Sequence, residues 1–460
     1  MRINPSKAWF IGALCVASFG YGAGTVHCRV FPFGVLQNAN RAWQALTAID
    51  DDCDRDVKEV QGLKEPCVRR YSAAAGDEMI LVAGGNDFLR EHSPDHGCLA
   101  WIMDREGKVM HVWHFDPGIW ANFEHVASVP GKAPQIYPVG LHLYADGGLL
   151  VSFQGFRTFP FGIGLARFDK DSKLLWKKEL MNHHWFTVAA DGRIYAPAMR
   201  TVDPPYTVGD TRFSISSADG KMLKDVVMIF DDAGDVLDEI PVLDAVIESG
   251  WAGLLRTQGA TATGKLNDER FVIMSGDPTH LNGVQLVDAQ TAAAHRWLNE
   301  GDLLLSMRHM NALGILDAKT RRFKWMLAGA GIQQHSPRFH REGLLFLDNR
   351  GGPAAAGGSQ LVQIDLDTRL PRTVFPRVSV SLPGEFYTSV AGQLDLSGSD
   401  RILVALTIGQ KIWEINLKTG EVLWEYICVD PQQHRQRRMH TAKYVQNVNF
   451  PFNKQSESTP

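Results

Sequence analysis

A repeated turn-and-strand unit constrains the fold of this chain more than any other feature. Each copy has two or three apolar residues, an aspartate or asparagine, a turn that often contains glycine, and then an apolar strand that usually carries tryptophan. Short apolar runs bounded by turn residues are typical of β-strands. About six copies occur, at residues 101–113, 165–176, 228–234, 315–325, 361–365 and 412–424.

A second unit, a hairpin turn that enters a strand, supplies the other half of each repeat. It occurs at residues 144–150, 189–195, 340–345 and 395–403. Together the two units give four strands per copy, and radial repetition of such sheets buries their edges and leaves a central channel. We therefore expect an all-β fold, a six-bladed β-propeller, over residues 79–450, followed by a disordered tail at 451–460.

The first 30 residues have the charge pattern of a targeting segment. Arg2 and Lys7 precede an uncharged apolar stretch from Ala8 to about Val26, close to the ~20 residues that a membrane-spanning helix requires. A cleaved signal peptide and a retained anchor both fit, and the anchor is favoured because no clear small-x-small cleavage site follows. We expect an N-terminal transmembrane helix within residues 1–30, a short connector at 31–78, and a membrane-anchored, single-pass protein whose propeller lies on the extracytoplasmic, periplasmic side.

Charge and cysteine spacing exclude several classes of protein. A net charge of -4 gives no general attraction to nucleic acid. No Cys-x-x-Cys spacing occurs, so a zinc ribbon or a thioredoxin-like motif is unsupported. In an oxidising compartment Cys53 and Cys67 are the preferred disulfide pair, because they are close in sequence and outside the repeats, and buried free thiols are the alternative.

Several histidines stand at equivalent places in the repeats, shortly before the turn-and-strand unit. Equivalent positions of successive blades converge on the axis of a propeller, so these residues can meet although they are far apart in sequence. We expect them to form a site at the axis; the alternative is that each one hydrogen-bonds a neighbouring blade. The residues are His142, His183, His184, His280, His335 and His440.

Two adjacent segments carry a further signal. Residues 333–352 hold a Gln-His pair that ends in His335, then a turn, and then an apolar strand that ends in Asp-Asn. Residues 303–325 hold a strand that ends in Ser-Met-Arg308, an aspartate turn, and a strand with tryptophan. In this order the motifs resemble the arylsulfotransferase family. The similarity extends over most of the propeller and is strongest from about 277 to 350.

The resemblance implies an activity and a set of residues. The family moves a sulfuryl group from an aryl sulfate donor to a phenolic acceptor through a sulfohistidine intermediate, independently of phosphoadenosine phosphosulfate, and no cofactor is expected. His335 matches the family's nucleophile, and Arg308 matches its Ser-x-Arg unit. His280 and Asn282 match its His-x-Asn unit. An earlier histidine of the family matches His184 or its neighbour His183.

These residue types suit sulfuryl transfer. The reaction, like phosphoryl transfer, needs an in-line nucleophile and cationic or hydrogen-bonding groups around the equatorial oxygens. Neutral His335 is a competent nucleophile, and Arg308 keeps its charge throughout and can contact two sulfuryl oxygens. His280 or His184 can protonate the departing phenolate and later deprotonate the acceptor phenol. The residues assigned to substrate binding are Asn282, His183, His142 and His440.

Two other classes of function stay open at this point. Residues 414–424 resemble the tryptophan docking repeat of quinoprotein dehydrogenases, a class that the count of about six repeats and the absence of an adjacent cysteine pair disfavour. A propeller scaffold without enzymatic activity is the other alternative, and it predicts that His335 and Arg308 are dispensable. No metal is expected, because Asp348 is expected to cap a turn. The expected partners are small-molecule aryl sulfates and phenols, and the oligomeric state is left open.

Overall fold

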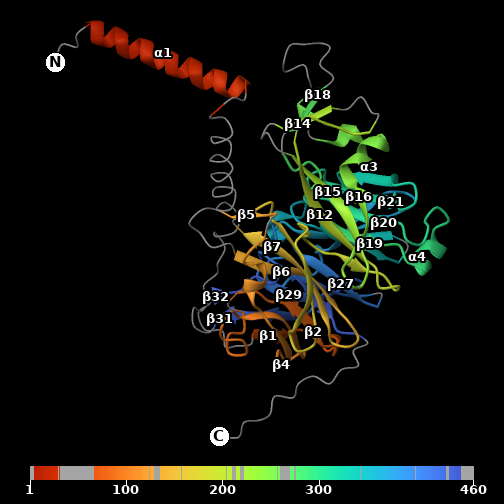
Figure 1. The fold of residues 1–460 in the computed structure, drawn as a ribbon. Helices are drawn as coiled ribbons and strands as arrows, with labels where there is room; N and C mark the ends of the chain where they lie inside the picture. Colours follow the sequence, from red (N-terminus) through yellow and green to blue (C-terminus); the bar gives the residue numbers. More distant parts are fainter. Residues whose placement is uncertain are drawn as a thin grey trace.

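Six antiparallel sheets, built from the residues that the structure describes, stand around one axis and form a β-propeller (Figure 1). The predicted all-β fold and its six blades are therefore confirmed. The structure is a computed structural model, and it describes residues 5–28, 31, 67–86, 88–123, 125–128, 135–156, 158–203, 205–209, 214–217, 222–255, 257–258, 270–273, 276–341, 343–398, 400–430 and 435–446.

The first three blades contain the strands of residues 80–241 together with one strand from the C-terminal end of the propeller. The first has β33 (Ala442–Tyr444), β2 (Ile80–Ala83), β3 (Cys98–Met103) and β4 (Val109–His114). The second has β6 (Gln135–Leu143), β7 (Leu149–Phe156), β9 (Gly162–Phe168) and β10 (Leu174–Lys178). The third has β11 (Thr187–Val188), β12 (Ile194–Val202), β15 (Met222–Phe230) and β16 (Val236–Pro241).

The next three blades follow in chain order. The fourth has β19 (Leu281–Leu286), β20 (Leu303–Met307), β21 (Ala312–Asp317) and β22 (Arg322–Ala328). The fifth has β23 (His335–His340), β24 (Gly343–Asp348), β25 (Gln360–Asp365) and β26 (Pro371–Phe375). The sixth has β27 (Gln393–Ser397), β28 (Arg401–Leu406), β29 (Lys411–Asn416), β30 (Val422–Ile427) and, at its outer edge, β1 (Cys67–Arg70).

Strands from both ends of the propeller close the ring. β33 pairs with β2 with Tyr444 opposite Ile80, so the last strand that the structure describes is the first strand of the first blade. β1 pairs with β30 with Cys67 opposite Ile427. The predicted connector, 31–78, thus includes an edge strand of the sixth blade, while its residues 32–66, like the predicted tail at 451–460, lie outside the described residues. Cys53 of the predicted disulfide also lies outside them, and Cys67 is a buried free thiol.

Short elements are inserted between the strands of the blades. A small sheet, whose β14 and β18 are parallel, extends beyond the third blade beside α3 (Figure 1). In the described part of the chain, two further strand pairs form short ribbons, and three single turns of 3-10 helix lie in the loops. These elements are β13 (Tyr206–Thr207), β14 (Ser214–Ser217), β17 (Thr257–Gln258), β18 (Arg270–Ile273), α3 (Val242–Glu248), α4 (Ala289–Ala294), β5 (Ala127–Ser128), β8 (Thr158–Phe159), β31 (Val429–Asp430), β32 (Arg435–Gln436), η1 (Pro117–Trp120), η2 (Ala252–Leu254) and η4 (Ala354–Ala356).

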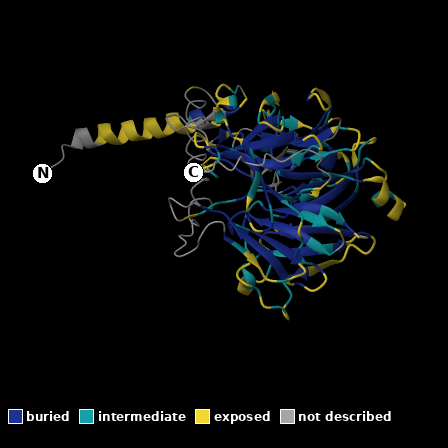
Figure 2. Ribbon diagram, turned by 90° about the horizontal axis from the view of Figure 1, so that it is seen from below, coloured by how far each residue is buried: buried dark blue, intermediate teal, exposed yellow. Residues whose placement is uncertain are grey.

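The N-terminal segment forms a helix, α1 (Pro5–Cys28), whose described side chains are mostly exposed (Figure 2). Among the described residues, no helix combines the length and the hydropathy that crossing a membrane requires. The predicted transmembrane helix is therefore not supported. Its mean hydropathy is lowered by glycines spread along the helix, at Gly12, Gly20, Gly22 and Gly24, and by His27 at its end.

The blades are buried on both faces because each one packs between two neighbours (Figure 2). Every residue of β3, β24 and β30 is buried. A strand with two buried faces has no polar side, so its sequence is a continuous apolar run. The repeat tryptophans Trp113 and Trp424 are completely buried in the clusters between blades, which is a packing role.

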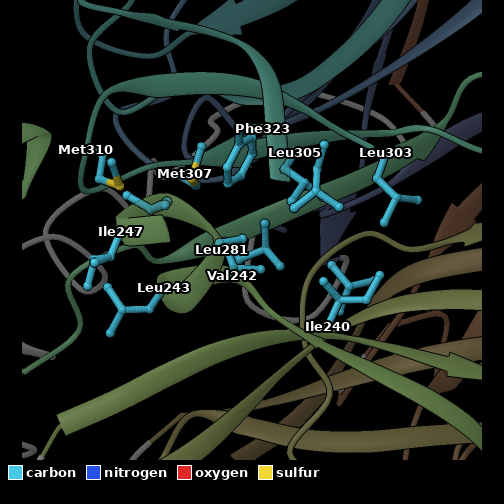
Figure 3. Packing of buried hydrophobic residues seen from close by; sticks show 14 of the residues in the cluster. Ile240, Val242, Leu243, Ile247, Leu281, Leu303, Leu305, Met307, Met310 and Phe323 are labelled. Carbon is cyan, nitrogen blue, oxygen red and sulfur yellow. The ribbon is translucent and has the colours of Figure 1, made fainter. Parts of the chain in front are cut away.

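A hydrophobic cluster fixes the start of the fourth blade. Val242, Leu243 and Ile247 of α3 belong to the same buried cluster as Leu281 and Leu305 of the fourth blade (Figure 3). Fully burying one such aliphatic side chain contributes about 1.5–3 kcal/mol. Leu281 is the residue after His280, so this packing holds one of the predicted site loops on a rigid support.

A buried carboxylate joins the sixth blade to the first. Glu414 on β29 accepts a hydrogen bond of 2.5 Å from Arg105, which lies between β3 and β4, and both side chains are almost completely buried. The same carboxylate accepts hydrogen bonds from Tyr444 of β33 (2.8 Å), from Arg401 (3.1 Å) and from the amide of Gly76 (3.0 Å). Its partners come from both ends of the ring, so Glu414 connects the two blades that close it.

We expect Glu414→Ala to destabilise the fold by about 3–5 kcal/mol, because the substitution leaves the buried Arg105 guanidinium without its anionic partner. The measurement is urea-induced unfolding of the full chain. Asp171→Ala is the matched control; it breaks the exposed ion pair with Lys170 and is expected to cost less than about 1 kcal/mol. Equal effects of the two substitutions would contradict the role given to Glu414.

Candidate active site

A cavity of about 510 Å³ receives residues from all six blades or from the loops that enter them, as expected for a site at the axis. His184, His280, His335 and Arg308 line it, and so does His440. These are five of the predicted site residues. The structure therefore brings most of the predicted set to one place, while their chemical roles stay predictions.

The three clustered histidines lie at the entry to three successive blades. His184 precedes β11, His280 precedes β19, and His335 begins β23. His184 and His280 have left-handed backbone conformations, with φ of 52° and 49°, and so does Ser336 after His335, with φ of 51°. Residues with a β-carbon rarely adopt this conformation, and it persists where the surroundings hold it, often at functional sites. The same turn is thus repeated around the axis.

The imidazole rings of these histidines approach one another closely. The ring centroids of His184 and His280 lie 5.3 Å apart, and those of His184 and His335 lie 6.3 Å apart. The ring of Trp185 stands edge-on to His335 at 5.9 Å. Its indole Nε1 donates to Thr441 Oγ1 (2.8 Å), which ties this wall of the cavity to the segment that enters β33.

The protonated nitrogen of His335 is fixed by Asn349. Asn349 Nδ2 donates to the carbonyl oxygens of Thr388 and Ala391, both at 2.8 Å, so its Oδ1 is the atom that faces His335 Nδ1 at 2.7 Å. Nδ1 must therefore carry the hydrogen, and Nε2 carries the lone pair. Burial and then the charge of Arg308 lower the pKa of His335 to about 3. The ring is neutral and its lone pair is available at ordinary pH.

His184 has the opposite tautomer. Gln154 Nε2 donates to His184 Nδ1 at 3.1 Å, and His183 Nδ1 approaches the same atom at 2.7 Å, so Nδ1 of His184 is an acceptor and Nε2 carries the hydrogen. Burial and the neighbouring imidazoles hold the pKa of His184 well below its ordinary value. His184 is thus a neutral hydrogen-bond donor toward the cavity.

His280 is paired with a carboxylate. Its Nδ1 lies 2.5 Å from Asp277 Oδ2, and its backbone amide donates to Asp277 Oδ1. Burial opposes ionisation of Asp277, but the adjacent imidazoles of His280 and His309 outweigh it and lower the pKa of Asp277 to about 2. Because Asp277 is ionised, it accepts the Nδ1 hydrogen of His280 and leaves Nε2 as the exchangeable position.

Arg308 is held from two sides. Its Nη1 donates to His309 Nε2 at 2.9 Å, and its Nη2 donates to Gln333 Oε1 at 3.0 Å. His309 Nδ1 in turn donates to the backbone oxygen of Asp277 at 2.6 Å. Burial and His280 lower the pKa of His309 to about 4, so His309 is neutral and can accept from the guanidinium. A chain of contacts therefore runs from Arg308 through His309 to Asp277, whose carboxylate contacts His280.

The remaining predicted residues lie around this cluster or away from it. His183 is completely buried behind His184, 3.7 Å from Asp225, and does not line the cavity. Asn282 is also buried, and its side chain donates to the backbone oxygen of Gln334, next to His335. His142 lines a separate cavity of about 230 Å³ beside Lys443. His440 lines the main cavity and stacks on Tyr137 with ring centroids 4.8 Å apart.

Several residues of the site escaped the sequence analysis. Asn349 had been assigned only to a turn, and Gln154 and His309 had no assignment. Asp277 stands three residues before His280, a spacing that allowed its contact with the imidazole and was the one available signal. Arg438, for which a position on a solvated surface was expected, also lines the cavity.

One group of side chains has the composition of a metal site. Candidate ligand atoms of Asp277, His280 and His309 lie within 4.8 Å of one another. The same side chains are already engaged in hydrogen bonds, since His280 contacts the carboxylate at 2.5 Å and His309 Nδ1 contacts the Asp277 backbone oxygen at 2.6 Å. Hydrogen bonding alone accounts for their positions.

A sequence model described as arylsulfotransferase (ASST) matches residues 140–429. This range contains the clustered residues His184, His280, Arg308 and His335. No curated protein sequence matches the chain.

Solved structures resemble the chain only distantly. A protein of unknown function from Bacteroides caccae has 12% identity and a TM-score of 0.47, covering 81% of this chain and 100% of its own. A chain of the nidogen/laminin complex has 8% identity and a TM-score of 0.41, with coverage of 81% and 100%. Virginiamycin B lyase from Staphylococcus aureus has 12% identity and a TM-score of 0.32, with coverage of 64% and 73%. None of these three TM-scores reaches 0.5, so the fold assignment rests on the strand pairing.

The buried neutral histidines make a prediction about stability and pH. His335 and His142 have pKa values of about 3, and His309 and His440 of about 4, against about 6.5 in an unfolded chain. Between these values the unfolded state binds more protons, so stability is lost as pH falls. We expect the free energy of unfolding to fall from pH 7 to pH 5 by at most about 1.4 kcal/mol per pH unit for each histidine.

Urea-induced unfolding measured at several pH values tests this expectation. Asp277, with a pKa of about 2, stays ionised across the window and does not contribute to the change. His142→Gln should make the dependence on pH shallower, because it removes one of the groups that take up a proton on unfolding. Constant stability from pH 7 to pH 5 would contradict the burial of these rings.

Proposed function

Because the chain belongs to the arylsulfotransferase family, we propose that its propeller transfers a sulfuryl group from an aryl sulfate to a phenol through a sulfated His335, without phosphoadenosine phosphosulfate. The family match includes every residue of the proposed machinery from His184 to Asn349. The arrangement of the site supports neither of the two alternatives, a quinoprotein dehydrogenase and a scaffold without enzymatic activity.

The observation that carries this proposal is the 2.7 Å hydrogen bond between His335 Nδ1 and Asn349 Oδ1. It keeps the hydrogen on Nδ1 and the lone pair on Nε2, in a ring that lines the cavity and has a pKa of about 3. In the first half-reaction Nε2 attacks the sulfur atom, the N–S bond forms, and the bond from sulfur to the aryl oxygen breaks. Asn282 supports this geometry through its hydrogen bond to Gln334, the residue before His335.

Arg308 supplies the charge that the transferred group requires. Its guanidinium is held by His309 and Gln333, so it does not need to reorganise as negative charge shifts between the sulfuryl and aryl oxygens. His184 adds a neutral donor, Nε2–H, on the side opposite to its contacts with Gln154 and His183. These two groups bind the equatorial oxygens of the sulfuryl group.

His280 is the proton carrier. In the first half-reaction its Nε2–H protonates the aryl oxygen as that oxygen leaves, and the Asp277 carboxylate stabilises the doubly protonated ring through Nδ1. In the second half-reaction neutral His280 takes the proton of the acceptor phenol. The phenol oxygen attacks sulfur, the N–S bond breaks, and His335 recovers its lone pair. His280 is preferred over His184 for this task because a carboxylate faces it.

The aryl group has an apolar surface to bind. Tyr137, Phe156, Phe161 and Trp185 line the cavity together with the histidines. The ring of Phe161 lies 5.2 Å from that of His280, beside the position that the aryl oxygen occupies in this scheme. An aromatic substrate can stack on such side chains with its reacting oxygen toward the imidazoles.

We also propose that the propeller lies on the extracytoplasmic side, from the basic and then apolar pattern of residues 1–30. Protease digestion of intact cells measures this directly. Protection of the propeller in intact cells would contradict it.

We expect wild-type protein to gain the mass of one sulfuryl group during brief exposure to para-nitrophenyl sulfate, and to lose it on addition of phenol. His335→Gln should show neither the adduct nor transfer, because amide nitrogen is not a nucleophile. Intact-protein mass spectrometry makes the measurement. The control His96→Gln changes an exposed histidine and should behave as wild type. An adduct on the His335 variant would place the sulfuryl group elsewhere.

We expect Asp277→Asn to slow transfer from phenyl sulfate by about 100-fold or more, because it removes the carboxylate that stabilises protonated His280. Transfer from para-nitrophenyl sulfate should suffer much less, since nitrophenolate leaves without protonation. The values of kcat/KM for the two donors are compared, because in a two-step transfer they report only the first half-reaction, and the exposed Asp367→Asn is the control. An equal loss with both donors would show that Asp277 acts on binding or on the fold, and not on the departing oxygen.

A further inference from the structure

The cavity is lined by two permanent cations and by no acidic side chain among the described residues. Arg308 is one cation and Arg438 is the other. His335 and His440 do not add formal charge, because their pKa values are about 3 and about 4. A single sulfuryl group accounts for Arg308 alone, so the second guanidinium calls for another anionic group.

Among the described residues, none accepts a hydrogen bond from Arg438 Nη2, whereas the guanidinium of Arg308 has two partners. Arg438 lies in the segment between β32 and β33, and its Nη2 is buried. His440 Nδ1, close by in the same segment, is likewise buried and unsatisfied. Buried polar atoms are almost always satisfied, so an unsatisfied guanidinium nitrogen is costly. Two such atoms on one wall of a cavity indicate a ligand that supplies acceptors.

Arg308 and Arg438 act on different histidines of the cavity. Burial and Arg308 lower the pKa of His335, whereas burial and Arg438 lower the pKa of His440. His440 stacks on Tyr137 of β6, and Tyr137 and Trp185 line the same cavity. An aromatic ring bound on these side chains would present one end to His335 and another end to Arg438.

We propose that Arg438, assisted by His440, binds a second anionic group of the substrate, so that this protein prefers phenols and aryl sulfates that carry a carboxylate away from the reacting oxygen. The inference rests on the proposed sulfuryl transfer for the identity of the reacting group. A planar carboxylate matches the fork of a guanidinium, and binding would satisfy the buried Nη2. The cavity volume of about 510 Å³ suits one substituted aryl molecule.

The test compares two acceptors of nearly equal shape, para-hydroxyphenylpropanoate and its uncharged amide, with para-nitrophenyl sulfate as the donor. For the wild-type full chain we expect kcat/KM to be about 10- to 100-fold higher with the carboxylate, which is the range for a hydrogen bond to a charged group. Arg438→Gln should reduce that ratio at least about tenfold, and Arg438→Lys should retain part of it. Arg435→Gln, which alters an exposed residue of β32, is the control and should retain the full ratio.

Binding of the carboxylate acceptor is measured separately by calorimetry, because this readout needs no turnover. If wild-type protein binds it more tightly than Arg438→Gln does, yet no sulfuryl transfer occurs, the anionic site stands and the proposed reaction fails. If transfer occurs with no preference between carboxylate and amide, the reaction stands and the role of Arg438 is overturned. An equal loss with both acceptors in Arg438→Gln would also overturn it, since that result indicates a structural residue.

Discussion

The closure of the ring of blades is the constraint on which the rest of the structure depends. Residues that are far apart in sequence, such as His184 and His335, meet only because each blade points its first strand at a common axis. The axis exists only when β33 pairs with β2 and Glu414 of the sixth blade engages Arg105 of the first. In a propeller the shape of the site is therefore a property of the whole ring, and a local cluster of motifs is not sufficient.

Within that ring, opposite protonation patterns are imposed on similar side chains. Asn349 leaves a lone pair on His335 Nε2, whereas Gln154 leaves a hydrogen on His184 Nε2. His280 differs from both, because the ionised carboxylate of Asp277 faces its Nδ1 and stabilises a proton there. Three imidazoles that are equivalent in position can thus act as acceptor, donor and proton carrier. Their differences arise from the residues that contact Nδ1 of each ring, because these partners set the tautomer and the charge of the imidazole.

Much of this arrangement could be predicted from the sequence. The repeats predicted the strands and the number of blades, because strands that are buried on both faces have short apolar sequences between turns. His184, His280 and His335 were predicted to meet because they precede equivalent strands. Partners such as Asn349 were missed, because nothing in a linear pattern distinguishes an amide that orients a ring from one that caps a turn. The separation of His142 from the other histidines depends on side-chain direction along a strand, which spacing alone did not resolve.

The position of β33 has a consequence for the order in which the site is completed during synthesis. The imidazoles of the third to fifth blades, and the arginine beside them, are all present in the chain before residues 438–444 leave the ribosome. The wall formed by Arg438 and His440 is made later, in the segment that leads into β33, the strand that closes the ring. A growing chain therefore carries the clustered histidines before the cavity around them is complete, and under the proposed scheme sulfuryl transfer would begin only once β33 docks.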